Sequence, residues 1–181
     1  MNRHPERLAQ IHARLKRFRF LHRSFAGAVL TLLCAANAVA DKGDPDFERV
    51  LNAAAPPPGV VFEVVQSRED DIRWALPLVA DRARRLRERF PELAVAVVFH
   101  GKEEFALMRD RAERYPEAHA EVQALNSAGV NVHVCETHAS WYRHSAADFP
   151  DYVKVVAAGP ATLNDYEALD WVRLFVTRPG K

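Results

Sequence analysis

Three runs of β-branched and other apolar residues constrain the fold of this chain most strongly. They span Val60–Val65, Leu93–Phe99 and Val130–Cys135, and a polar, helix-compatible segment follows each of them. Runs of this kind are typical of strands that are buried on both faces of a parallel sheet. Tyr152–Ala157 and Trp171–Thr177 predict two further strands.

Helical patterns separate the predicted strands. Apolar residues spaced by three and four predict an amphipathic helix, in which Pro77 marks either a kink or a late start: Ile72, Leu76, Val79, Ala83, Leu86 and Phe90. Further helices are expected at Lys102–Arg114, Pro116–Ala128, Ala139–Ser145 and Ala161–Leu169, and the charged residues of Asp81–Glu88 and Arg109–Arg114 are interpreted as solvated helix faces. Strands that alternate with helices predict an α/β fold, a three-layer α/β/α sandwich with a mainly parallel five-stranded sheet over residues 60–177.

The first forty residues have the pattern of a secretory signal peptide. Seven Lys/Arg and one acid, Glu6, lie within the first 24 residues, and the uncharged apolar run Phe25–Ala36 follows them. Ala38-Val39-Ala40 then supplies a small-x-small cleavage site. The apolar run is shorter than the ~20 residues that a membrane-spanning helix needs. We therefore expect a periplasmic or secreted protein cleaved near Ala40, with an uncleaved signal anchor as the alternative and the only expected membrane contact.

Removal of residues 1–40 changes the charge and the cysteine content. Of the 25 Lys/Arg and 24 Asp/Glu in the whole chain, 18 and 23 remain, so the net charge turns from +1 to about −5. No basic patch is left that would predict nucleic-acid binding. Cys135 is the one cysteine that remains, which excludes an internal disulfide and suggests intermolecular pairing or a reactive thiol. Residues 41–59 form a Pro-rich segment that leads into the domain.

Polar residues follow three of the predicted strands, in Gln66-Ser67, His100-Gly101-Lys102 and Cys135-Glu136-Thr137-His138. Parallel strands would bring these segments together at one edge of the sheet, where ligands bind in open α/β folds. A cysteine at a helix N-terminus is stabilised as the reactive thiolate. Cys135 is therefore the candidate catalytic residue, and we expect a partly exposed thiol. A buried, inert cysteine is the alternative.

The neighbours of Cys135 have distinct expected roles. His100 would raise the thiolate fraction as a charged neighbour. Gly101 would let the backbone approach a ligand closely. Thr137 and the amides after Cys135 would hold an anion or a sulfur-bound adduct, whereas Glu136 opposes a thiolate by its charge.

Metal binding is a competing use of the same side chains. His133 and Cys135 point to one face of a strand, and His100, His138 and His144 are further imidazoles that could join them. The spacing matches none of the structural zinc patterns, so we expect no metal and no other cofactor. The chain also lacks a Gly-rich phosphate loop and a GxSxG motif.

The order of these motifs resembles the DsrE/DsrF-like family of small α/β proteins associated with sulfur oxidation and sulfur relay. The likeness rests on Val97-Val98-Phe99-His100-Gly101, on Leu125-Asn126-Ser127-Ala128-Gly129-Val130 before Cys135, and on Ala139, Arg143 and Val153-Lys154-Val155 after it. The resemblance implies a homo-oligomer in which Cys135 carries sulfur as a persulfide. His138 and Arg143-His144 depart from the Arg-Gly pair that often follows the short helix in the family.

The resemblance and the leader together predict an exported sulfur carrier, transferase-like if active. His100, Gly101, Thr137, His138 and Arg143 are its expected binding residues. Its expected partners are sulfur donor and acceptor proteins or small sulfane-sulfur species, and a homo-oligomer is expected. A non-catalytic ligand-binding or assembly module of the same fold is the alternative.

Overall fold

The computed structural model describes residues 44–178 and residue 180, so the predicted leader and its cleavage site lie outside the described residues. Its central element is a five-stranded sheet with the strand order β4-β3-β2-β1-β5. All four strand pairs are parallel. The strands are β1 (Gly59–Val64), β2 (Ala94–Phe99), β3 (Asn131–Cys135), β4 (Lys154–Val156) and β5 (Val172–Phe175).

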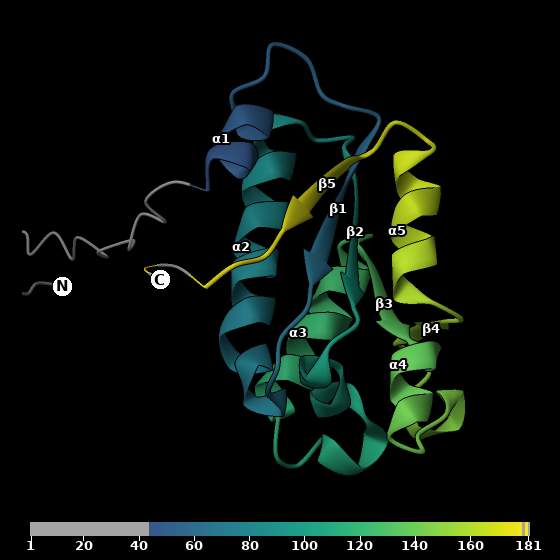
Figure 1. Cartoon of the computed structure of the whole chain (residues 1–181). Helices are drawn as coiled ribbons and strands as arrows, with labels where there is room; N and C mark the ends of the chain where they lie inside the picture. The colour runs from purple at the N-terminus through teal and green to yellow at the C-terminus, as the bar shows by residue number, and fades with distance from the viewer. Residues whose placement is uncertain (1–43, 179, 181) are drawn as a thin grey trace, which may run out of the picture. The chain divides into compact units, whose positions relative to one another are not determined.

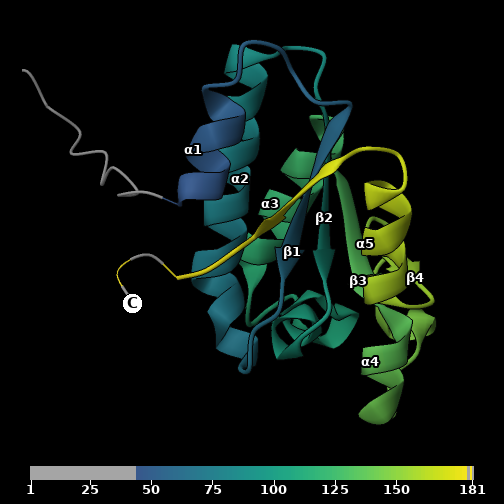
Figure 2. The same cartoon turned by 45° about the horizontal axis from the view of Figure 1, so that its top comes forward.

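Helices cover both faces of this sheet, as Figure 1 and Figure 2 show: α2 lies on one side and α5 on the other. The α-helices are α1 (Pro45–Leu51), α2 (Ile72–Arg89), α3 (Pro116–Ser127), α4 (Glu136–Trp141) and α5 (Gly159–Glu167). Short 3-10 helices are η1 (Glu69–Asp71), η2 (Lys102–Leu107), η3 (Arg109–Arg111) and η4 (Ala146–Asp148). The α/β fold and the parallel five-stranded sheet predicted from the sequence are confirmed. Among the described residues no helix is long and apolar enough to cross a membrane.

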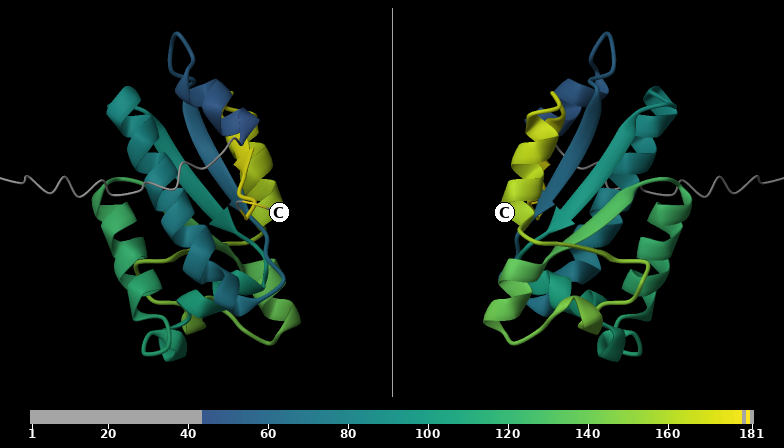
Figure 3. Two further views of the ribbon diagram at one scale, coloured as in Figure 1. Left: turned by 90° about the vertical axis from the view of Figure 1, so that its left-hand side faces the viewer. Right: turned by 90° about the vertical axis from the view of Figure 1, so that its right-hand side faces the viewer.

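The two faces of the sheet differ in the size of the apolar cluster that covers them. Successive side chains of each strand point to opposite faces. Val60, Phe62 and Val64 of β1 face the large core beneath α1, α2 and α3. Val61 of the same strand faces α5, where the apolar cluster is small and consists of Val61, Ala96, Val98 and Leu163. Figure 3 shows the molecule from each of these sides in turn. The α5 face therefore has room for the polar side chains that form the candidate site.

Two helix predictions need correction. Residues 102–114 contain the 3-10 helices η2 and η3 in place of an α-helix. Within η2, Glu103–Leu107 are all buried. The short helix predicted at Ala139–Ser145 starts earlier, at Glu136, directly after β3.

The segment before the prolines contains a helix that the sequence analysis missed. Asp44 caps α1 by accepting hydrogen bonds from the backbone N–H groups of Asp46 and Phe47. Phe47 is buried in the main core, and Asp44 also accepts a hydrogen bond from Arg82 at 2.9 Å. Arg82 is itself buried, so not every charge of Asp81–Glu88 lies on a solvated face.

The helix α2 runs without interruption from Ile72 to Arg89 across Pro77. Its buried side chains include the apolar stripe predicted from the spacing. They belong to the main core, together with Val60, Phe62 and Val64 of β1. The late start that was considered for this helix is therefore wrong, since Pro77 lies inside it.

Candidate functional site

The candidate site lies at the carboxyl ends of β1, β2 and β3, the end of the sheet at which α4 begins (Figure 1). Phe99 pairs with Val134, so His100 and Cys135 follow at the same level on neighbouring strands. The backbone N–H of Lys102 donates to the carbonyl of Gln66 at 2.8 Å, which ties the end of β1 to the same edge. The predicted meeting of these three polar segments is therefore confirmed.

Cys135 is the last residue of β3 and the N-cap of α4. Its Sγ accepts hydrogen bonds from two backbone amides, Gly159 N at 3.1 Å and His138 N at 3.4 Å. Gly159 opens α5, so the sulfur lies at the N-termini of two helices. Unpaired N–H groups at such termini favour negative charge. The sulfur thus accepts hydrogen bonds from the first turns of two helices, whereas the sequence predicted a single helix terminus.

The thiol is buried, with 2% of Cys135 exposed, so the prediction of a partly exposed cysteine is wrong. Burial follows from the same contacts that supply the donors, because α4 and α5 close over the end of β3.

Glu104 is the residue that the sequence analysis missed most clearly. Its side chain is fully buried, and Oε2 accepts a hydrogen bond from the backbone N–H of Cys135 at 2.9 Å. Burial raises the pKa of Glu104 to about 9; within this net value the hydrogen bond from Cys135 N–H acts to lower the pKa and the charge of Glu103 acts to raise it. Glu104 is therefore a neutral carboxylic acid near pH 7, and it places no negative charge beside the sulfur.

His138 completes the hydrogen bonds of Glu104. Its Nδ1 lies 2.8 Å from Oε1 of Glu104. Burial lowers the pKa of His138, with smaller contributions from His100 and Lys102. The Nδ1 atom of a neutral imidazole accepts a hydrogen bond from the O–H group of the neutral acid, so both groups are paired and neither is charged. His138 is thus a binding partner of Glu104, while its backbone N–H binds the sulfur.

His100 approaches Cys135 across Gly159. A Cβ placed on Gly159 would lie 2.8 Å from the Cβ of His100 and 3.3 Å from the Cβ of Cys135. Glycine at this position is therefore needed for the close packing of the two side chains. Nε2 of His100 is held by Glu63, 2.8 Å from Oε1.

Gly101 allows a close backbone approach, but to the protein itself. A Cβ there would lie 2.5 Å from the backbone N and O of Gln66 and 2.5 Å from Oε2 of Glu103. Glu103 is fully buried and accepts hydrogen bonds from the backbone N–H groups of Gln66 and Gly101. Burial raises the pKa of Glu103 to about 7. Gly101 and Glu103 thus hold the ends of β1 and β2 together beside the site.

Thr137 and Arg143 lie further out. The Thr137 hydroxyl donates to the carbonyl of Ala157 at 2.6 Å, and the Thr137 backbone N–H donates to the same oxygen at 3.0 Å. These bonds join α4 to the segment after β4. Arg143 is exposed and has a φ of 65°, and its guanidinium makes no hydrogen bond or ion pair with the residues that the structure describes.

Aromatic rings surround the outer side of α4. Phe105 stacks on His138 with ring centroids 5.3 Å apart and contacts Tyr142 edge-on at 5.1 Å. Trp141 packs against His138 and is 72% exposed. These rings cover the Glu104–His138 pair, and Trp141 extends their apolar surface towards solvent.

The competing metal site does not assemble in the part of the chain that the structure describes. No group of three His, Cys, Asp or Glu side chains with metal-binding geometry occurs there. His133 is buried beneath α5, and its Nε2 lies 2.8 Å from the Tyr166 hydroxyl. Burial lowers the pKa of His133 to about 4, and the charge of Lys154 contributes. His133 is therefore a neutral structural residue of the α5 interface.

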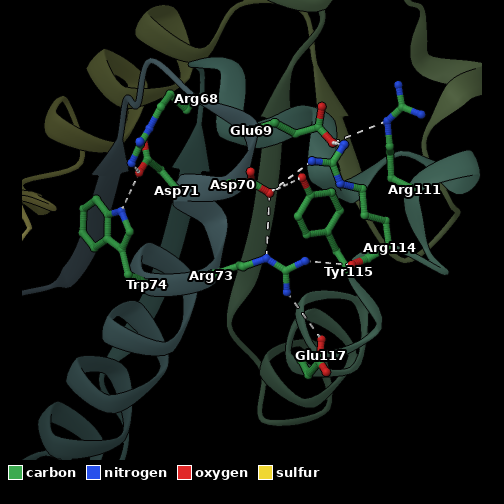
Figure 4. Close-up of polar contacts among 10 residues, drawn as sticks. All are labelled: Arg68, Glu69, Asp70, Asp71, Arg73, Trp74, Arg111, Arg114, Tyr115 and Glu117. Atoms are coloured by element: carbon green, nitrogen blue, oxygen red, sulfur yellow. Dashed lines mark hydrogen bonds and ion pairs between the residues drawn. The ribbon is translucent and has the colours of Figure 1, made fainter.

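A second polar cluster lies on the opposite side of this edge and joins η1 to η3 (Figure 4). Nε of Arg111 lies 3.4 Å from Oε1 of Glu69, and Nη2 of Arg114 lies 3.4 Å from Oδ1 of Asp70. Asp70 also accepts a hydrogen bond from the buried Tyr115 at 2.7 Å. The arginines that we expected on a solvated helix face therefore hold two irregular segments together.

Comparisons with known proteins identify the fold and no activity. No protein-family model matches this sequence, and no curated protein matches it. The structure is similar to that of MTH1491, a protein of unknown function from Methanobacterium thermoautotrophicum, with a TM-score of 0.53, 21% sequence identity, and coverage of 64% of this chain and 96% of that one. A weaker match is BT1422, a conserved protein of unknown function from Bacteroides thetaiotaomicron, with a TM-score of 0.46, 8% identity, and coverage of 66% and 95%. The first match shows a shared α/β fold, and the DsrE/DsrF-like resemblance stays a prediction.

One sequence signal could have revealed more of the site. Glu63 interrupts the apolar run Val60–Val65, and an acid inside a buried strand requires a buried partner. Glu103-Glu104 directly before Phe105-Ala106-Leu107 is a similar signal, since acids there join an apolar segment. Their partners come from remote parts of the chain, so the roles of these acids depend on the tertiary structure.

Proposed function

We propose that this protein is a sulfur carrier that holds sulfane sulfur as a persulfide on Cys135. The observation that carries the proposal is the pair of backbone N–H groups, of Gly159 and His138, that donate to Sγ. Hydrogen bonds to a charged acceptor contribute about 1.5–3 kcal/mol each, which offsets part of the cost of burying a thiolate. The neutral Glu104 supports the same charge state because it adds no repulsion.

Transfer would proceed by exchange at sulfur. The thiolate attacks the outer sulfur of a donor persulfide, a new S–S bond forms on Cys135, and the donor leaves as a thiol. No external oxidant or reductant is needed, because the sulfur atom passes between thiols at an unchanged oxidation state. The proposed partners are therefore sulfur donor and acceptor proteins or small sulfane-sulfur species, and the proposed compartment is the periplasm or the extracellular space.

The test is sulfur uptake by the folded, full-length chain. Incubation with inorganic polysulfide should add the mass of sulfur to the peptide that contains Cys135, and a thiol reductant should remove it. Cys135→Ser should abolish the adduct and leave the fold unchanged. The chain's other cysteine, Cys34, lies in the predicted leader, so Cys34→Ser in the uncleaved chain is the control and should retain the adduct. A native protein that takes up no sulfur at Cys135 would refute the carrier function.

The burial of Cys135 favours one alternative, a binding or assembly module of the same fold in which the thiol is a packing residue. The two functions predict different thiol accessibility. Alkylation by iodoacetamide at a rate well above the rate of global unfolding supports the carrier. Alkylation that occurs only on unfolding supports the module.

A further inference from the structure

His100 is linked to two charged residues, Glu63 and Arg173, that have no role in the proposed function. Glu63 of β1 is 5% exposed, although it lies in an otherwise apolar strand. Its Oε1 binds Nε2 of His100 at 2.8 Å, and its Oε2 accepts a hydrogen bond from Nε of Arg173 at 2.6 Å. The side chains of Arg173, Glu63 and His100 therefore form a continuous line on the α5 face, running from β5 across β1 to the end of β2.

We infer that Glu63, held by Arg173, is a positioning residue that sets His100 as the general base for Cys135. This inference rests on the proposed function. A ring nitrogen that donates to a carboxylate carries the proton of the neutral imidazole, so Nδ1 of His100 is the unprotonated nitrogen. Nδ1 has no hydrogen-bond partner among the described residues.

His100 and Cys135 follow paired residues on neighbouring strands, and both pack around Gly159. A Cβ built on Gly159 would lie 2.8 Å from the Cβ of His100 and 3.3 Å from the Cβ of Cys135. A base acts at hydrogen-bond distance or through one water, and such distances are often longer before substrate binds. The titratable or charged groups facing His100 are Glu63 from β1, His138 from α4 and Cys135 from β3. Arg173 from β5 reaches it through Glu63.

The proposed step is balanced in protons and electrons. Nδ1 of His100 takes the proton of the Cys135 thiol, and the thiolate attacks the outer sulfur of a persulfide donor. The S–S bond of the donor breaks, and its electron pair leaves on the donor thiolate, which takes the proton back from His100. Cys135 then bears the persulfide, and the donor is released as a free thiol.

Cys135, His100 and Glu63 would thus act as nucleophile, general base and orienting acid, an arrangement in which the acid fixes the tautomer of the histidine. Arg173 has a second acidic partner, Glu167, at 3.4 Å. Glu167 does not bind His100, so it offers a matched control for the charge of Glu63.

The experiment is a double-mutant cycle on Cys135 reactivity in the full-length protein. Alkylation by iodoacetamide and sulfur uptake from polysulfide are both measured near neutral pH. Glu63→Gln and His100→Gln should each slow both reactions by about tenfold to a hundredfold. The double variant should be no slower than His100→Gln, because Glu63 acts only through His100. Glu167→Gln should change the rates less than about twofold.

The tautomer gives a readout that a merely structural role of Glu63 would not move. The ring ¹⁵N chemical shifts of His100 should report Nε2–H in the wild type and a mixture of tautomers in Glu63→Gln. If Glu63→Gln does not fold, Arg173→Gln should produce the same change in the ¹⁵N shifts and a smaller loss of rate. Additive losses in the double variant, or an unchanged tautomer, would overturn the inference. If the cycle holds for alkylation while polysulfide adds no sulfur, the positioning role stands and the carrier function fails.

Discussion

At the residue scale, Glu104 defines the charge of the site. A fully buried carboxyl whose oxygens contact one backbone N–H and one imidazole is favoured as the neutral acid. Its neighbour Glu103 is also buried and has a raised pKa. Two adjacent acids beside a candidate thiolate would be unfavourable if both were ionised at neutral pH. Protonation of Glu104 removes this conflict.

Glu104 should make the stability of the protein fall as the pH rises. The pKa of Glu104 is raised from 4.5 to about 9 in the folded state, so the folded protein keeps a proton that the unfolded chain loses. The contribution to stability is complete below pH 4.5 and is lost as the pH rises towards 9, at up to about 1.4 kcal/mol per pH unit. Glu104→Gln keeps the shape and the hydrogen bonds of the neutral acid. It should flatten the decline, as measured by urea unfolding over this range.

Glu113→Gln is the control for this prediction, because Glu113 is exposed on the irregular segment before α3. It should leave the pH dependence of unfolding unchanged. Glu103 will still contribute up to about pH 7, so the difference between wild type and Glu104→Gln should be clearest above that value. An equal slope in both proteins there would show that Glu104 is ionised in the fold.

At the element scale, α5 joins the sheet to the sulfur. Its first residue, Gly159, donates to Sγ of Cys135, and its later residue Tyr166 binds His133 on β3. The apolar cluster beneath α5 contains four buried residues, far fewer than the core beneath α2. The attachment of α5 therefore depends strongly on polar contacts, and protonation of His133 would oppose it.

His133 should make the protein less stable in acid. Burial lowers the pKa of His133 from 6.5 to about 4, so the unfolded chain binds a proton that the folded protein excludes. Stability is complete above pH 6.5 and is lost as the pH falls towards 4, at up to about 1.4 kcal/mol per pH unit. His133→Gln should reduce this loss in urea unfolding, while His144→Gln, outside the α5 interface, should not. The explanation is wrong if both variants keep the wild-type slope.

The elements that could be predicted from the sequence are those with long-range apolar order. The strands that end at Val64, Phe99 and Cys135 can be predicted because parallel strands are buried on both faces and therefore have nearly continuous apolar sequences. Their shared direction also placed His100 beside Cys135 correctly. The prediction of an α-helix at η2 is wrong because Glu103 and Glu104 are buried and accept hydrogen bonds from backbone N–H groups of remote strands. The spacing of apolar residues in the sequence does not indicate such bonds.

The polar partners of the site could not be predicted for a related reason. Glu104 binds Cys135 across 31 residues of sequence, and Glu63 binds Arg173 across 110. Such pairs can be predicted only when the order of the strands in the sheet is known. The burial of Cys135 likewise depends on α5, which follows it by 24 residues.

At the scale of the whole molecule, the sheet ends at β5 with apolar side chains on the α5 face. Phe175 of β5 is 58% exposed, and Val65, just after β1, is 49% exposed. Both have the odd-numbered alternation that points to the same face as Glu63. Leu169, after α5, is also exposed. Monomeric domains seldom leave apolar patches of this kind uncovered.

We therefore expect self-association through the β5 end of the sheet. Light scattering of the wild-type protein should show a species larger than a monomer, and Phe175→Glu should shift it to the monomer because a charge cannot be buried unpaired in an apolar contact. Trp141→Glu is the matched control on the α4 side: it changes another exposed aromatic residue and should leave the oligomer intact. Dissociation by Trp141→Glu in place of Phe175→Glu would move the interface to the aromatic surface beside Cys135. A wild-type monomer at high concentration would contradict self-association itself. Because Phe175 lies on the strand next to Glu63, an interface there would also cover the Arg173–Glu63 pair and shield it from water.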